Sequence, residues 1–549
     1  MSVEHLPEEP RPISAALDHF RAHGGMLRTR DALGVCPRID LLMKAEIEDS
    51  LDLWLSEARI EVKWGAWIMD DRHKQFRVWD ALDGRREIFC PEDSLPEDDL
   101  VFFLLELIPG LDLSAFQEFY SKDLRGQPPF SVALMSVLLV YSYSVGVFSS
   151  RKISLACERN LAFLAIVGND RPDFRTISDF RKNHQSAMKP LFLEVLRVAG
   201  ELGMVQLGNL STDGTKIEAN ASRHKAMSYG YMTKDLERLQ AEIDQLLENA
   251  HRTDDEQDAA LGSRRGDELP EELKRREDRI AKIQAAKARL EAEAQARAAA
   301  EQLERDAAAA QRAAEGKSRR GKPPAPVDPT PEAKAQTNFT DPEAKIMKRS
   351  NKGFDYCYNA QAVVDSEHQI IVAAEATAAA NDKQQAVPLA QATLDNLAAA
   401  GIELPRDEQG QPRPIPNTAD SGYFSEANVR DVTALGLDPY YATGRQKHHA
   451  PEETAPATAQ TATAQTATTE TGTTETAKET MSRKLRTEPG RLLYAARKHI
   501  VEPVFGQIKR VRGFRKFSQR GLKRISAEWQ LICTTHNLLK IWRFTFRSG

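Results

Sequence analysis

Several features are scarce in this sequence, and each scarcity removes a class of protein. The five cysteines are scattered and form no CxxC pair, which argues against a disulfide framework or a structural zinc site and indicates reduced thiols. No apolar run approaches the roughly 18 residues of a membrane-spanning helix. The acidic, proline-rich start, MSVEHLPEEPRP, has neither the basic nor the apolar part of a signal peptide. We therefore expect a cytoplasmic protein without a membrane partner.

The composition is that of a soluble globular protein with an unevenly distributed charge. Hydrophobic residues make up 41% and charged residues 28% of 549 residues, a length that suggests roughly three to four domains. The net charge is −5, yet Arg483–Gly549 contains 17 Lys or Arg and three acids. Such a block is typical of a surface that contacts nucleic-acid phosphates, the alternative being a solvated tail. Interleaved aromatic residues favour a folded segment: Tyr494, Phe505, Phe514, Phe517, Trp529 and Trp542.

The first 200 residues divide into two predicted parts. Residues 1–97 form an N-terminal extension, in which Ala22–Gly34 resembles the start of a winged helix-turn-helix; a small structural α/β domain is the alternative. Residues 98–200 have helical apolar repeats and predict a helical domain. Arg175–Asn183 is a polar helix that Thr176 or Ser178 could cap. Helical domains of this kind often bind DNA, although helix packing alone would give the same pattern.

From residue 201 the pattern changes to a mixed α/β core with insertions. Leu207–Thr212 predicts a strand that delivers Asp213 at a sharp turn. Residues 234–316 predict a coiled-coil hairpin, either a projecting arm or a solvated spacer, and residues 317–337 a linker. The apolar positions of that hairpin recur with heptad-like spacing: Met232, Leu236, Leu239, Ile243, Leu246, Leu273, Ile280, Ile283 and Leu290.

The core continues beyond the linker and, with residues 201–233, comprises residues 338–549. The segments Tyr358–Val364 and Ile370–Glu375 predict a β-hairpin. Thr/Ala-rich residues 449–480 predict a disordered insertion. The other expected elements are a helix at Asp382–Ala399, strands at Pro414–Ala419 and Pro439–Ala442, and helices at Arg491–Lys509 and Ser526–Phe544.

Three acids have the setting that two-metal phosphoryl transfer requires, namely carboxylates that converge from distant parts of a fold. Asp213 and Asp420 each end a predicted strand with a glycine nearby, and Glu502 is an isolated acid in the basic block. Each also has a simpler explanation, because Asp-Gly and Asp-Ser-Gly are common turns and Glu502 could be a surface acid. The pattern alone does not select these three among 80 acidic residues.

A resemblance to a known family selects them. Blocks in the expected order resemble the signature blocks of bacterial insertion-sequence transposases with a DDE active site, and Phe102–Gln185 resembles their helical N-terminal DNA-binding domain. Residues 1–97 lie outside the resemblance. The blocks are Ser211–Ser222, Tyr358–Asp365, Ala380–Gln385, Ala419–Phe424, Val501–Lys509, Gly513-Phe-Arg, Arg520-Gly-Leu and His536–Leu539.

The resemblance implies a ribonuclease H-like catalytic core. In it, Asp213, Asp420 and Glu502 are the catalytic acids and hold two Mg²⁺ ions, with Mn²⁺ as a substitute. Implied partners are double-stranded transposon-end and target DNA and further copies of the chain, in a nucleoid-associated setting. The family also places a Tyr, a basic residue and a Lys around the Glu. The predicted DNA-binding residues are Tyr494, Arg497, Lys498, Lys509, Arg510 and Lys216.

Two details of the predicted site stay open. Four residues separate Arg497 from Glu502 where the family usually has three, and Lys498 has the usual spacing, so either could contact DNA. Lys216 lies near Asp213 but would also fit a solvent-facing strand. Other polar residues have structural interpretations: Asn359 and Gln361 satisfy backbone groups in the sheet, and Asp382 caps a helix.

Three functions compete. The first is an enzyme that cuts its terminal inverted repeats and joins them to target DNA. The second is a related ribonuclease H-like nuclease, or an inactive relic that binds DNA without transposing. The third is a non-catalytic DNA-binding or coiled-coil scaffold, which the presence of all three acids in the matching blocks disfavours.

Overall fold

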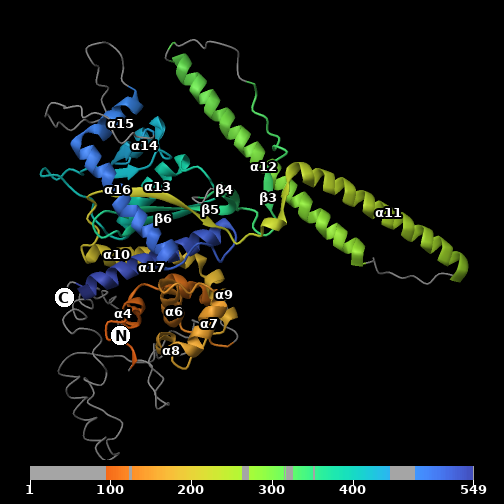
Figure 1. Cartoon of the computed structure of the whole chain (residues 1–549), viewed down its shortest axis with the longest axis horizontal. Coiled ribbons are helices and arrows are strands. Elements are labelled where there is room, and N and C mark those ends of the chain that lie inside the picture. The colour runs from red at the N-terminus through yellow and green to blue at the C-terminus, as the bar shows by residue number, and fades with distance from the viewer. Residues whose placement is uncertain are drawn as a thin grey trace, which may run out of the picture. The chain divides into compact units, whose positions relative to one another are not determined.

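A computed structural model describes residues 94–122, 127–261, 271–314, 316, 325–349, 353–444 and 476–547 (Figure 1). The expected winged helix-turn-helix and nearly all of the low-complexity insertion lie outside these residues. The chain divides into two compact units. The first comprises Met1–Ile217, Asn359–Ser518 and Lys523–Gly549, and the second comprises Glu218–Tyr358 and Gln519–Leu522.

The first unit begins with the predicted helical region. Helix α6 is buried along nearly its whole length, because residues from Val132 to Ser144 include no charged side chain and α4 and α8 pack against it. Helix α9 is amphipathic, and Asp173 caps it by accepting a hydrogen bond from Thr176 N. The expected caps, Thr176 and Ser178, lie inside the helix instead. The helices are α4 (Leu100–Leu107), η2 (Ile108–Gly110), α5 (Ser114–Gln117), η3 (Glu118–Lys122), α6 (Val132–Ser144), α7 (Ser150–Arg159), α8 (Leu161–Val167), α9 (Phe174–Asn183), η4 (Gln185–Ala187) and α10 (Met188–Glu201).

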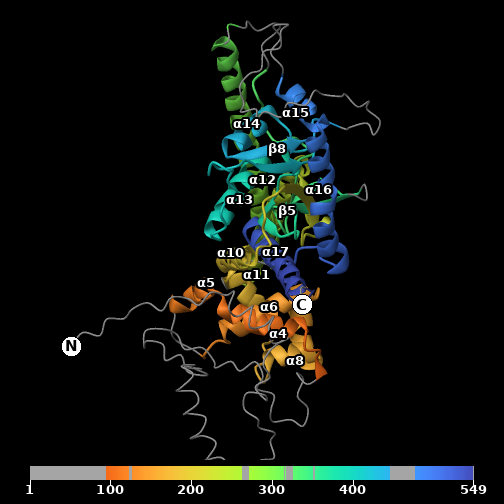
Figure 2. The ribbon, with the colours of Figure 1, turned by 90° about the vertical axis from the view of Figure 1, so that its left-hand side faces the viewer.

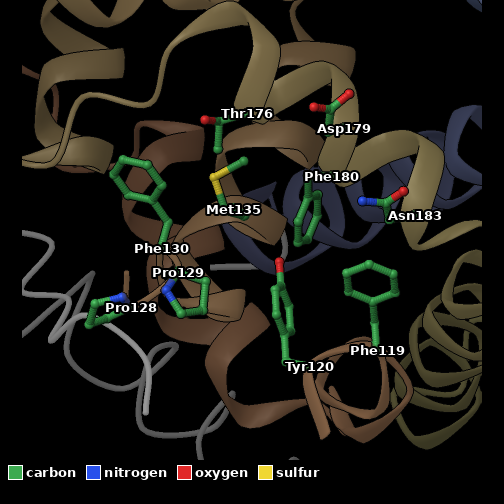
Figure 3. Close-up of a pocket in the computed structure, with 10 residues that line it drawn as sticks. All are labelled: Phe119, Tyr120, Pro128, Pro129, Phe130, Met135, Thr176, Asp179, Phe180 and Asn183. Atoms are coloured by element: carbon green, nitrogen blue, oxygen red, sulfur yellow. The ribbon is translucent and has the colours of Figure 1, made fainter. Parts of the chain in front are cut away.

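Two features of the helical region bear on the search for a site. Among the described residues no single helix is long and apolar enough to span a membrane, although the bent pair Leu100–Gly110 and Ser114–Ser121 passes that test by length and composition. A pocket in this region is lined mainly by aromatic and proline side chains together with Asp179 and Asn183 of α9 (Figure 3). None of its lining residues belongs to the predicted catalytic set.

A mixed sheet forms the rest of the first unit, with strand order β6-β5-β1-β7-β8. Strands β1 and β7 are parallel, as are β7 and β8, whereas β5 and β6 form the predicted antiparallel hairpin. Strand β5 is buried at all but its first residue, as expected of a strand covered on both faces. The bounds are β1 (Leu210–Glu218), β5 (Phe354–Asp365), β6 (Ile371–Thr377), β7 (Ile415–Ala419) and β8 (Leu437–Tyr441).

Helices from the second half of the chain cover this sheet (Figures 1 and 2). Helix α13 packs against β6, α16 against β7 and β8, and the buried Trp529 of α17 donates from Nε1 to the carbonyl of Gln361 in β5. Residues 477–480, expected in the disordered insertion, instead begin α15, where Thr476 and Glu479 form a capping box. The helices are η6 (Lys383–Gln385), α13 (Ala386–Ala399), α14 (Glu426–Ala434), α15 (Ala477–Arg486), α16 (Glu488–Gly506), the π-helical turn η7 (Gln507–Val511) and α17 (Leu522–Arg547).

The second unit is dominated by two long helices, α11 (Tyr229–Leu261) and α12 (Glu271–Ala314), which pack against each other. Four of the predicted heptad positions form their buried core: Met232, Leu239, Ile283 and Leu290. The helical character of this segment is thus confirmed, while a coiled-coil geometry stays a prediction. Short strands complete the unit: β2 (Ala226–Ser228) pairs with β3 (Gln336–Asn338), and β4 (Lys345–Lys348) pairs with the first residues of β5.

Candidate active site

Two of the three predicted acids come together at the centre of the sheet. In the parallel pair β1–β7, Thr212 lies opposite Ala419, so Asp213, the next residue of β1, and Asp420, which directly follows β7, are neighbours. In addition to burial, the negative charge of Asp420 acts on Asp213 and raises its pKa, as expected of two neighbouring carboxylates. The expected turn at Asp213 was wrong, because β1 continues to Glu218, but the strand end before Asp420 is confirmed.

The surroundings of Asp213 disfavour its charged form. Burial raises the pKa of this carboxyl to about 6, and the negative charges of Asp420 and Asp382 add to the rise. Arg497 opposes it, donating from Nη1 to Asp213 Oδ2 at 3.1 Å, and the backbone N–H of Gly214 also donates to the carboxylate. Excess negative charge of this kind is a common feature of sites that bind a cation or transfer protons.

Helix α16 turns one side toward the two aspartates. Arg497 lies on that side, with its guanidinium 5.8 Å from the ring centroid of Tyr494. Burial raises the pKa of Tyr494. The charge of Arg497 lowers this pKa, and the charges of Asp420 and Asp213 raise it. Lys498 is exposed, so the structure places Arg497, and not Lys498, beside the aspartates.

Glu502 lies elsewhere on the same helix. It lies five positions after Arg497, and at about 100° per residue the two side chains stand roughly 140° apart. The Glu502 side chain is exposed, and among the described residues no hydrogen bond or ion pair joins it to Asp213 or Asp420. Within the same part of the chain, no group of three His, Cys, Asp or Glu side chains could hold a metal ion. The three-acid metal centre therefore stays a prediction.

Two predicted lysines lie along β1 next to Asp213. Lys509, in the π-helical turn that follows α16, donates from Nζ to Thr215 Oγ1 and, at 3.0 Å, to the carbonyl of Lys216. Lys216 itself makes a 3.2 Å ion pair with Asp382. Arg510 is exposed. The structure thus brings Lys509 and Lys216 to the strand that carries Asp213, while Lys498 and Arg510 present their charges to solvent.

Sequence reasoning missed a polar network beside this strand. Asn359 and Gln361 were expected to satisfy backbone groups in the sheet, but both donate to Asp382 Oδ1, at 2.5 and 2.7 Å, and Asn359 also donates to the carbonyl of Ala379, beyond the end of β6. Asp382 does not cap a helix, because its side chain makes no capping hydrogen bond. Buried Tyr423 donates to Gln361 Oε1. Two amide side chains at alternate positions in the middle of a buried strand were the available signal, because buried amides need partners.

Comparison with known families now adds to this geometry. Residues 89–183 match a transposase domain, DUF772, and residues 455–542 match a transposase DDE domain. The first match covers the region from α4 to α9, and the second includes α16, with Tyr494, Arg497 and Glu502. Together the two matches indicate an insertion-sequence transposase of the DDE type. No curated protein and no solved structure matches it.

Membership of this family identifies DNA as the substrate of the transposase. It also agrees with the charge distribution of the C-terminal block, where Phe514, Phe517 and Trp529 are buried while Arg510, Arg515 and Lys516 are exposed. The block is therefore a folded basic surface, as its aromatic content predicted. Asp213 and Asp420 lie outside both matched ranges, so their assignment rests on the geometry described above.

Proposed function

We propose that this transposase cleaves DNA strands at the terminal inverted repeats of its insertion sequence and joins the resulting 3′-hydroxyl ends to target DNA. One observation carries the proposal: Asp213, on β1, and Asp420, directly after the parallel strand β7, are neighbours although 207 positions apart in the chain, and Arg497 of α16 in the matched DDE domain donates to Asp213. The mixed sheet with acids on adjacent central strands supports a ribonuclease H-like core.

Divalent metal ions, Mg²⁺ or Mn²⁺, belong to the same proposal. The paired carboxylates suit such ions, because Asp213 gains from a nearby positive charge that Arg497 provides in this structure. Asp213 and Asp420 would hold the ions, and Glu502 would join them from α16. Two ions so bound would supply activation of the attacking hydroxyl and stabilisation of the departing oxygen.

The remaining charged residues have roles in holding DNA. Lys509 and Lys216 flank Asp213 and are suited to a phosphate close to the cleaved bond, whereas exposed Lys498 and Arg510 suit the neighbouring backbone. Tyr494 lies beside Arg497 and keeps its guanidinium directed at the site. The helical region contributes exposed cations on α7 and α9, Arg151, Lys152, Arg175 and Lys182, for DNA binding. The α11–α12 hairpin is a candidate arm for pairing two copies.

The test is a strand-transfer assay with purified protein and labelled duplexes that carry the element's ends. Wild type should cleave and join in Mg²⁺ or Mn²⁺. Asp213→Ala, Asp420→Ala and Glu502→Ala should each abolish both steps while DNA binding persists. Glu488→Gln is the matched control, since Glu488 is another exposed acid of α16.

The assay also separates the second candidate, a related nuclease or relic. The exposed position of Glu502, away from the aspartate pair, is the observation that keeps this candidate open. Cleavage without joining would support a nuclease, and DNA binding without cleavage would support a relic. Full activity in Glu502→Ala would refute the assigned role of that residue.

A further inference from the structure

Asp382 is the centre of a hydrogen-bond network that connects three segments of the first unit. Its Oδ1 accepts from Lys216 Nζ on β1 at 3.2 Å and from Asn359 Nδ2 and Gln361 Nε2 on β5 at 2.5 and 2.7 Å. The two amides have no exposed surface, and the side chain of Asp382 is 23% exposed. Three side-chain donors therefore share one carboxylate oxygen and fix the position of the Asp382 side chain.

The network extends from Asp382 to the turn that carries Asp420. Gln361 presents Nε2 to Asp382 and Oε1 to the hydroxyl of Tyr423, which lies three residues after Asp420 and is fully buried. Gly422 lies between the carboxylates of Asp420 and Asp382. A Cβ at this position would lie 3.0 Å from Asp420 Oδ1 and 3.5 Å from Asp382 Oδ2. The two carboxylates therefore flank the same glycine.

The network also reaches Asp213. Gly214, the next residue of β1, passes so close to β5 that a Cβ would lie 2.9 Å from Asn359 Oδ1 and closer still to Gln361. The amides that Asp382 orients are thus packed against the backbone next to Asp213. Asn359 Oδ1 is itself buried without a hydrogen-bond partner, so this side chain is held through its amide nitrogen, which donates to Asp382 at 2.5 Å and to the carbonyl of Ala379 at 3.3 Å.

We infer that Asp382 is a positioning residue of the active site, which fixes the Asp213 strand and the Asp420 turn against each other through Lys216, Asn359, Gln361 and Tyr423. This inference rests on the proposed function and deepens it. Displacement of reacting groups by about 1 Å can slow an enzyme about 100-fold, and loss of a group that orients a metal ligand typically weakens metal binding by about 10- to 100-fold. Asp382 should therefore affect the chemical step more than DNA binding.

The experiment measures single-turnover cleavage of terminal-repeat DNA at saturating protein, with DNA affinity measured separately. Asp382→Ala removes the shared acceptor and should slow cleavage about 100-fold while DNA affinity changes less than threefold. Asp382→Asn keeps an acceptor oxygen for the amides and loses only the charge that pairs with Lys216, so it should fold and show a smaller loss. Asp395→Ala is the control, because Asp395 is an exposed acid on α13, the helix that Asp382 precedes.

A mutant cycle distinguishes positioning from a general structural role. Tyr423→Phe removes the hydroxyl at the other end of the chain Asp382–Gln361–Tyr423, so Asp382→Ala combined with Tyr423→Phe should be no slower than Asp382→Ala alone. Additive losses, or full cleavage rates in Asp382→Ala and Tyr423→Phe, would overturn the inference.

A second readout does not depend on turnover. Calorimetric titration with Mn²⁺ alone should show about tenfold weaker binding to Asp382→Ala than to wild type. An inactive wild type would refute the proposed function, and the titration would still decide the inference: equal Mn²⁺ affinity in wild type and Asp382→Ala, or no Mn²⁺ binding to either, would overturn it.

Discussion

Two arginine–carboxylate clusters in the first unit differ in how completely their charges are compensated. In the helical region, Arg181 of α9 donates to Tyr143, the carbonyl of Phe148, Ser150 and Ser518, while Glu528 of α17 accepts from Tyr143 and twice from Ser518. In the candidate site, Arg497 is the cation that reaches Asp213, beside the further negative charges of Asp420 and Asp382.

The acid–base properties of the two clusters follow from this difference. Although burial works against the charged form, Tyr143 and Glu528 raise the pKa of Arg181, so that the cluster favours its charged state. At the other cluster, burial and neighbouring acids raise the pKa of Asp213, so that its charged state is disfavoured. The first arrangement stabilises the fold. The second leaves the charge of Asp213 incompletely compensated at the place where DNA chemistry is proposed.

The largest effect is expected when an acid at the candidate site is neutralised. Asp420→Asn keeps the shape of the side chain and should slow strand cleavage about 1000-fold or more, because a ligand for the catalytic cations is lost. Its thermal stability should not fall, since no compensating ion pair is removed. Cleavage rates and melting temperatures, measured side by side with wild type, check both expectations. A stable and fully active Asp420→Asn protein would contradict the site.

The opposite outcome is expected at the compensated cluster. Glu528→Ala removes a buried acid and leaves the half-buried Arg181 charged and short of its partner, so it should lower the free energy of unfolding by about 3 kcal/mol. Denaturant unfolding measures this loss. Asp431→Ala, which breaks an exposed ion pair with Arg430, should cost less than about 1 kcal/mol. If both substitutions cost the same, the buried cluster has no special role in stability.

The contrast also explains which parts of the structure the sequence could predict. The helices of residues 98–200, the β5–β6 hairpin, and the strands β7 and β8 were predicted because their signals are local: apolar periodicity and turn residues at the ends. Asp420 follows a strand as expected for the same reason. Asp213 was misplaced at a turn because Asp-Gly is a local turn signal, whereas pairing with β7 and β5, more than 140 residues away, keeps the chain extended.

The network around Asp382 could not be predicted in this way. Its ion-pair partner Lys216 is 166 residues away, and nothing in the local sequence distinguishes Asp382 from a helix cap. The choice between Arg497 and Lys498 depends on the rotation of α16, which buried Val501 and Val504 determine by packing. Arg497 lies on the same face of α16 as these two valines. Spacing along the sequence alone does not distinguish Arg497 from Lys498.

A smaller effect, on stability, should accompany neutralisation of Asp213. Because the pKa of Asp213 is raised in the folded protein, protonation of this carboxyl stabilises the fold. The stabilisation is complete below the ordinary pKa of 3.8 and is lost as pH rises through about 6. Metal-free Asp213→Asn should therefore be more stable than wild type at pH 8 by about 1–3 kcal/mol, and the gain should disappear near pH 4. Melting temperatures in chelator across this pH range test the sign. A gain that is independent of pH would contradict the assigned pKa.

The smallest expected effect concerns Arg497, and it decides whether this residue or Lys498 belongs to the site. Because the positive charge of Arg497 lowers the pKa of Asp213, Arg497→Gln should raise that pKa further and move the acid limb of the cleavage profile to higher pH. Lys498→Gln, one residue away but exposed, should leave the limb in place and only weaken DNA binding in a salt-dependent way. Single-turnover rates from pH 5 to pH 9 at saturating DNA measure the limb. A shift in Lys498→Gln without one in Arg497→Gln would show that α16 rotates when DNA binds, and that the compensation of Asp213 seen here belongs only to the DNA-free transposase.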